Sequence, residues 1–98
     1  MAHDPATARK SVTIVNSNGL HMRPSTKFVK LANSFRSEVS VTSQGGTANG
    51  KSILDMTSLA AECGTTLELE ARGEDAESAV AALAELVAAG FHMDDEAA

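Results

Sequence analysis

A histidine, an arginine and a proline lie close together in the segment NSNGLHMRPS, residues 16–25. His21 follows a glycine by two positions, Arg23 follows the histidine by two more, and Pro24 comes next. A neutral imidazole is a nucleophile that can form a covalent intermediate, and an arginine can donate two hydrogen bonds to one phosphate. These residue types at this spacing favour chemistry on an anionic group, above all transient phosphorylation of His21.

The segment lies where a turn becomes a helix. NSNG is typical of a turn, and from Met22 onward apolar residues such as Phe28 and Leu31 recur at helical spacing. Pro24 suits a first helical turn, where its missing N–H would be unpaired anyway. His21 then stands at or just before a helix N-terminus, whose amides form an anion site. Their field disfavours a second positive charge, so we expect an exposed, neutral imidazole.

Three other roles for His21 deserve weighing. A lone histidine at a helix start is more often a cap or a plain surface residue. As the general base of a small hydrolase, His21 would need a partner acid or nucleophile at a usable spacing and a deep pocket, and the sequence offers neither. His21 could also be inert in a plain interaction module. The arginine and proline beside His21 favour transient phosphorylation, and thus a phosphoryl carrier, over these three roles.

The elements that must position this segment follow from periodicity. The chain of 98 residues is one domain of the globular type. Alternating apolar residues predict strands over 11–15, 38–42 and 65–71, a short strand is expected over 47–49, and helices are expected from Met22, Ser52 and Asp75. The strands are apolar on one face only, which predicts an α+β open-faced β-sandwich. It consists of a four-stranded antiparallel sheet with three helices on one face, in the order β-α-β-β-α-β-α.

The expected domain covers residues 11–91. We expect residues 1–10 to form a flexible N-terminal extension and residues 92–98 to form an acidic, frayed tail. Gly90 should end the last helix.

The short helix after residue 51 carries a second group of candidates. Ser52 and Asp55 fit a capping box, and Cys63-Gly64 is the expected end of the helix. Ile53, Leu54 and Met56 cannot all point inward from so short a helix. We expect some of them to border His21, together with Met22, as an apolar partner interface; the alternative is that most belong to the core.

Composition excludes several classes of function. A net charge of −5 argues against binding of nucleic acid, which requires basic patches. The sequence contains no secretory leader and no apolar run long enough to span a membrane, so a soluble, cytoplasmic protein is expected. A single cysteine, Cys63, fits a reducing compartment. His3, His21 and His92 lie too far apart to indicate a metal site. We expect a monomer without a cofactor.

The segment NGLHMRPS strongly resembles the active-site signature of the HPr family, the histidine-containing phosphocarriers of the bacterial phosphoenolpyruvate-dependent sugar phosphotransferase system. The similarity continues through NGKSILDMTSLAAECGTTLELEARGEDAESAVAALAEL and covers about residues 11–91. The resemblance implies a phosphoryl carrier without turnover of its own. Enzyme I would phosphorylate Nδ1 of His21, and the carrier would pass the group to EIIA components of sugar permeases. Arg23 and Pro24 match the family's arginine, which stabilises the phosphoryl group, and its proline at the helix start.

The resemblance also covers Ser52, which matches the serine that HPr kinase/phosphorylase modifies; the alternative is that Ser52 is only a helix cap. Met22 and Ser25 stand where alanine is usual, and Asp55 replaces a small or apolar residue. These departures concern the choice of partner more than the chemistry. An alternative function within the family is that of a paralogue in a nitrogen-regulatory or signalling phosphorelay without sugar transport.

Overall fold

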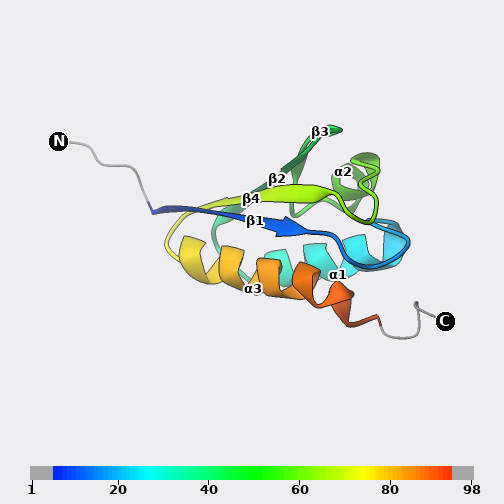
Figure 1. Cartoon of the computed structure of the whole chain (residues 1–98). Coiled ribbons are helices and arrows are strands. Elements are labelled where there is room, and N and C mark those ends of the chain that lie inside the picture. Colours follow the sequence, from blue (N-terminus) through cyan, green and yellow to red (C-terminus); the bar gives the residue numbers. More distant parts are fainter. Residues whose placement is uncertain (1–5, 94–98) are drawn as a thin grey trace.

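The computed structural model describes residues 6–93 of the chain. The order of elements is the expected one (Figure 1), with a short 3₁₀ turn, η1, added after the last helix. The elements are β1 (Thr7–Thr13), α1 (Met22–Ala32), β2 (Glu38–Ser43), β3 (Gly46–Asn49), α2 (Ile53–Ser58), β4 (Thr66–Arg72), α3 (Ala76–Ala88) and η1 (Gly90–His92). Within residues 6–93, no helix is long and apolar enough to cross a membrane.

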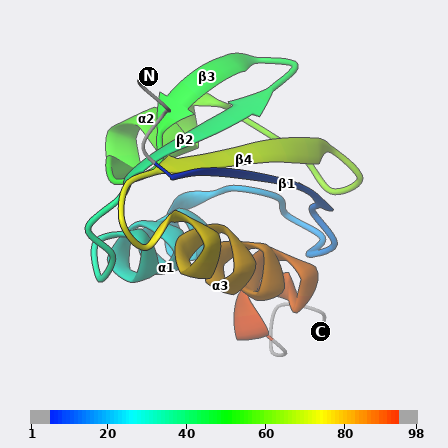
Figure 2. The same cartoon turned by 90° about the vertical axis from the view of Figure 1, so that its left-hand side faces the viewer.

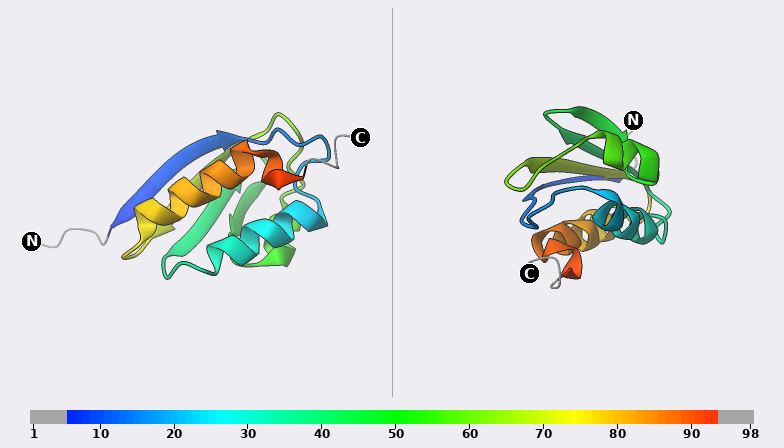
Figure 3. Two further views of the ribbon diagram at one scale, coloured as in Figure 1. Left: turned by 90° about the horizontal axis from the view of Figure 1, so that it is seen from below. Right: turned by 90° about the vertical axis from the view of Figure 1, so that its right-hand side faces the viewer.

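The four strands form one antiparallel sheet in the order β1-β4-β2-β3. The last strand in the sequence therefore lies between the first and the second. Helices α1 and α3 lie side by side against one face of this sheet (Figures 2 and 3). The shorter α2 contacts α1 and β3. The expected open-faced α+β sandwich is confirmed.

The two faces of the sheet differ as alternation predicts. The helix-covered face carries side chains that are at most 3% exposed, namely Val39, Val41, Leu67, Leu69 and Ala71. On the other face, the Ser11 hydroxyl donates to the Glu68 carboxylate at 2.7 Å, and Arg9 pairs with Glu70 at 3.0 Å. This open face is polar, so the hydrophobic core lies only between the sheet and the helices.

Strand β1 begins earlier than expected. It spans Thr7–Thr13, whereas the alternation predicted a strand over 11–15. Residues 7–10 of the expected N-terminal extension therefore pair with β4. The polar run of Arg9, Lys10 and Ser11 obscured the strand, because β1 is an edge strand with most of its side chains exposed. Residues 1–5 of the expected extension lie outside the described residues, as does the expected tail beyond residue 93.

Helix α2 ends earlier than expected. It stops at Ser58, and Cys63-Gly64 does not cap it. The chain leaves the helix because Ala60 adopts the left-handed conformation, with φ of 51°. Gly64 lies instead in the turn before β4, where its N–H donates to the Ile14 carbonyl at 2.8 Å. Gly90, with φ of 65°, follows α3 as expected.

Asp75 joins the start of α3 to the segment before β2. Its carboxylate accepts hydrogen bonds from the N–H groups of Arg36 and Ser37, both at 2.9 Å, and from the Ser37 hydroxyl at 2.6 Å. These bonds, with that of the Ser37 hydroxyl the largest cause, lower the pKa of Asp75 from 3.8 to about 2. The connection from α1 to β2 is thereby held against α3.

Candidate functional site

His21 is the N-cap residue of α1, as its place in the sequence predicts. Its backbone is extended, with φ of −78° and ψ of −169°, and its side chain makes no capping hydrogen bond. The imidazole residue is half-buried, not fully exposed as the sequence suggested. The imidazole therefore does not serve as the side-chain cap of α1.

The loop before His21 is a tight turn built on Gly19. The Asn16 side-chain amide donates to the Gly19 carbonyl at 2.8 Å, and the Gly19 N–H donates to the Asn16 carbonyl at 3.1 Å. Gly19 has φ of +67°, a conformation that favours glycine. The next N–H, that of Leu20, donates to the carbonyl of Ala61 at 2.9 Å. The approach to His21 is thus held both by its own turn and by the chain after α2.

The first turn of α1 combines buried anchors with exposed charge. Pro24 and Ser25 are buried, and the Ser25 hydroxyl donates to the Leu20 carbonyl at 3.2 Å. Ser25, a departure from the family signature, is therefore buried and ties the helix to the preceding loop. Met22 and Arg23 are exposed on the same turn. The turn carries no acidic residue, so no negative side chain within Met22–Ser25 neutralises the positive N-terminal end of the helix dipole.

A shallow recess of about 360 Å³ opens beside His21. On the side opposite His21 and Met22 it is lined by Thr57, Ala60 and Glu62. Sequence reasoning did not find these three residues, because they lie far along the chain in a helix end and a loop without periodicity. The feature that marks this region is visible in the structure and not in the sequence. Ala60 adopts the left-handed conformation, which few residues other than glycine adopt.

Helix α2 is capped by Ser52, whose hydroxyl accepts a hydrogen bond from the Asp55 N–H at 3.2 Å. The other half of the expected capping box does not form. The Asp55 carboxylate accepts instead from the N–H of Asn49 at 3.0 Å, so it ties α2 to the end of β3. Lys51 adds a second tie, because its ammonium donates to the Phe35 carbonyl at 2.8 Å. Ser52 therefore stands on a helix start that is fixed from both sides.

The expected interface residues divide between surface and core. Met22 is 60% exposed, Leu54 75% and Ile53 37%. Met56 is fully buried, so including it in a partner interface was wrong. Its side chain is part of the hydrophobic core. Met22, Ile53 and Leu54 are hereafter called the apolar patch.

The groups able to bind a metal are scattered in the part of the chain that the structure describes. Residues 6–93 contain no cluster of three or more histidine, cysteine or carboxylate side chains that could hold an ion. Cys63 is exposed, and its thiol donates to the Val15 carbonyl at 3.6 Å.

Residues 8–89 match the family model described as the PTS HPr component phosphorylation site. The chain is 47% identical over 78 residues to the phosphocarrier protein HPr of Haemophilus influenzae, covering 80% of this chain and 92% of that protein. The crystal structure of HPr-C-His from Thermoanaerobacter tengcongensis matches with a TM-score of 0.82 at 35% identity, covering 87% of this chain and 96% of that one. For the phosphocarrier protein HPr of Bacillus anthracis the TM-score is 0.79 at 39% identity, with 84% and 98% covered.

Proposed function

The chain belongs to the HPr family of phosphocarrier proteins of the phosphotransferase system, and on this premise we propose that it accepts a phosphoryl group from phosphorylated enzyme I on His21 and passes it to EIIA components of sugar permeases. The family resemblance carries the choice of Nδ1 as the acceptor atom. The protein then acts as a relay, and it has no substrate turnover of its own.

The observation that carries the proposal is the position of His21 relative to α1. The imidazole stands at the N-cap of a helix whose first turn lacks an acidic side chain, and exposed Arg23 follows two positions later. A phosphoryl group on His21 would meet the positive end of the helix dipole and a guanidinium able to bind it at two points. Pro24, the third residue of α1, is compatible with this arrangement, because an N–H at that position would have no partner within the helix.

The transfer needs no cofactor. The lone pair of Nδ1 attacks phosphorus in line with the donor's bond, a new P–N bond forms, and the donor's bond to phosphorus breaks. The proton of the neutral ring stays on Nε2, and the same steps in reverse deliver the group to EIIA. Arg23 stabilises the charge on the phosphoryl oxygens in both directions. This stabilisation has to remain modest, because a tightly held phosphoryl group could not be passed on.

The apolar patch is the proposed docking surface for enzyme I and EIIA. Large exposed apolar side chains are common centres of protein interfaces, and Met22 directly follows His21 in the sequence. Methionine adapts its shape to different partners, which suits a carrier that must bind a donor and an acceptor in turn. The patch therefore brings each partner to the residue that carries the phosphoryl group.

Ser52 is the proposed site of regulation by HPr kinase/phosphorylase. It is half-buried at the start of the helix that carries Ile53 and Leu54 of the apolar patch. A phosphate there would add nearly two negative charges beside the docking surface and near the Asp55 carboxylate. It would oppose docking by desolvation and by repulsion of acidic groups on the partner.

The direct test is incubation with phosphoenolpyruvate and enzyme I, followed by intact-mass analysis. One phosphoryl group should be added, and it should be labile in acid and stable in base. The His21→Ala variant should remain unmodified with an unchanged circular dichroism spectrum, whereas His92→Ala, a matched loss of another histidine, should be labelled normally. Labelling retained in His21→Ala would disprove the assignment.

A further inference from the structure

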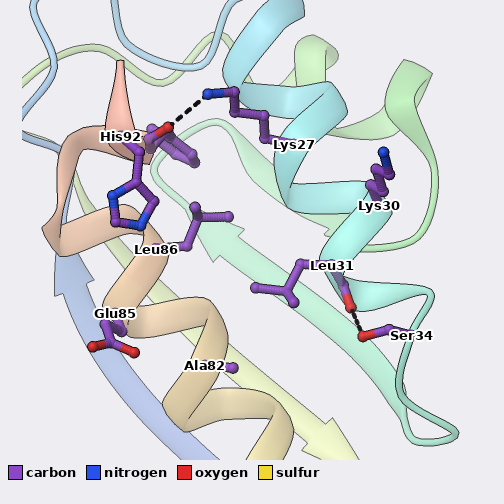
Figure 4. A pocket seen from close by; sticks show the side chains of 9 residues that line it. Lys27, Lys30, Leu31, Ser34, Ala82, Glu85, Leu86 and His92 are labelled. Atoms are coloured by element: carbon purple, nitrogen blue, oxygen red, sulfur yellow. Dashed lines mark hydrogen bonds between the residues drawn. The ribbon is translucent and has the colours of Figure 1, made fainter. Parts of the chain in front are cut away.

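A groove of about 660 Å³ lies between α1 and α3 (Figure 4), and no residue of the apolar patch lines it. Leu31 from α1 and Leu86 from α3 both reach into it, and Ala82 lines its far end. Lys27 and His92 stand together at the other end, with Lys30 on the same helix as Lys27. The groove thus has an apolar interior and a polar end.

From this arrangement we propose a second ligand site, which takes a small amphiphilic anion with an apolar body and a single carboxylate or sulfonate group. The anionic group lies toward Lys27 and His92, Lys30 adds a second positive charge on the α1 wall of the groove, and the apolar body lies between Leu31 and Leu86. The site does not depend on the relay function of His21.

The charged side chains that line the groove favour binding of an anion. Two lysines line the groove against a single acidic side chain, Glu85, in a chain with a net charge of −5. The ammonium of Lys27 donates to the Phe91 carbonyl at 3.0 Å and fixes that wall. Among the described residues, no hydrogen bond or ion pair is found for the Lys30 ammonium, so it can serve a ligand.

The backbone at this end is unusual in a way that fits a binding site. Gly90, Phe91 and His92 are consecutive residues with φ of 65°, 59° and 56°. Left-handed conformations are strained for the last two, and such strain concentrates where the surrounding structure holds a side chain for a purpose. Here the turn buries Phe91 in the wall of the groove and sets His92 at its polar end.

The groove fits a small molecule better than a protein. Its leucines are half-buried within the recess, whereas the large exposed apolar side chains, such as Met22 and Leu54, do not line it. A protein interface usually covers a wide area, and most of its binding energy comes from a few large side chains that fill pockets on the partner. A volume of this size, with an apolar lining and few polar groups, is typical of small-ligand sites.

The test uses sodium octanoate as the probe, titrated into the full chain and followed by ¹H–¹⁵N correlation spectra. We expect saturable shifts at Leu31, Ala82, Leu86 and His92, with a dissociation constant of about 1 mM or tighter. Octanol, which has the same apolar body without charge, should bind about tenfold more weakly.

Three variants make the result decisive. Ala82→Leu fills the groove and should abolish the shifts, while Lys30→Gln keeps most of the stem and should weaken binding about tenfold. Leu54→Ser, in the apolar patch, is the matched control and should bind normally. Circular dichroism establishes that each variant is folded. Absence of saturable shifts, shifts confined to the apolar patch, or undiminished binding by Lys30→Gln would each overturn the proposal.

Discussion

Gly19 lies directly against the carbonyl of Ala61, so that a Cβ atom at position 19 would clash with that oxygen. The next residue, Leu20, donates its N–H to the same carbonyl at 2.9 Å. Two loops that are far apart in the sequence are thereby pressed together beside His21.

Replacing Gly19 by alanine should destabilise the protein and misplace His21. The left-handed backbone alone costs about 1–2 kcal/mol for a residue with a Cβ, and the clash with Ala61 adds to it. Gly90→Ala is a close control, because Gly90 has φ of +65° but its added Cβ would meet only Val15, at 3.6 Å. Thermal melts should show the larger loss for Gly19→Ala. Equal losses would mean that the contact with Ala61 does not require glycine.

The Arg23→Ala variant should still be phosphorylated on His21, because the nucleophile remains. The rate should fall about 10- to 100-fold in both directions, the equivalent of a charge-assisted hydrogen bond of about 1.5–3 kcal/mol. Rapid-quench measurements with enzyme I and with an EIIA domain would measure both steps. Arg36→Ala removes the same charge from an exposed position in the segment before β2 and should transfer normally. If both variants transfer at the wild-type rate, Arg23 does not act on the phosphoryl group.

Substitutions of Ser52 separate regulation from helix capping. Ser52→Asp keeps an acceptor for the Asp55 N–H, so the free energy of unfolding should change by less than about 1 kcal/mol. Transfer from enzyme I should nevertheless slow markedly, because a new carboxylate stands beside the docking surface. Ser52→Ala should show the reverse, a loss of about 0.5–2 kcal/mol with near-normal transfer. Wild-type transfer by Ser52→Asp would leave Ser52 as a cap and nothing more.

The stability of the protein in acid should depend on Asp75. Its folded-state pKa of about 2 lies below the usual 3.8, chiefly because the Ser37 hydroxyl donates to the carboxylate. The stabilisation is therefore complete above pH 3.8 and disappears as the pH falls through about 2. Asp75→Asn should be less stable than the wild type at neutral pH, and the difference should vanish at the acid end. Urea melts across this range would measure it, with Glu77→Gln as a control whose difference should not follow this course.

Periodicity explains which parts of this structure are predictable from the sequence. Alternation in β4 and helical spacing in α1 revealed those elements because each has one buried face. Edge strand β1 was misplaced because its polar side chains face water. Met56 was misassigned because α2 has only six residues, too few for periodicity to define a buried face.

The histidine site was predictable only in part, for a different reason. His21 and Arg23 are neighbours in the sequence, so local spacing was enough to bring them to one helix start. The residues across the recess arrive from another loop through the contact of Leu20 with Ala61. That contact joins two backbone groups, which any residue type can supply, so the identities of Leu20 and Ala61 do not reveal it.

The strand order also has a consequence for how the chain folds. Thr13 in β1 faces Thr66 in β4, 53 positions later, and β4 in turn pairs with β2. A ribosome must therefore release most of the domain before the first strand finds its neighbour, and closing so long a loop is entropically slow. Until then the loop around Gly19 lacks Ala61 as a support. His21 is synthesised early, yet the contact with Ala61 that supports its loop can form only after α1, β2, β3 and α2 have been synthesised.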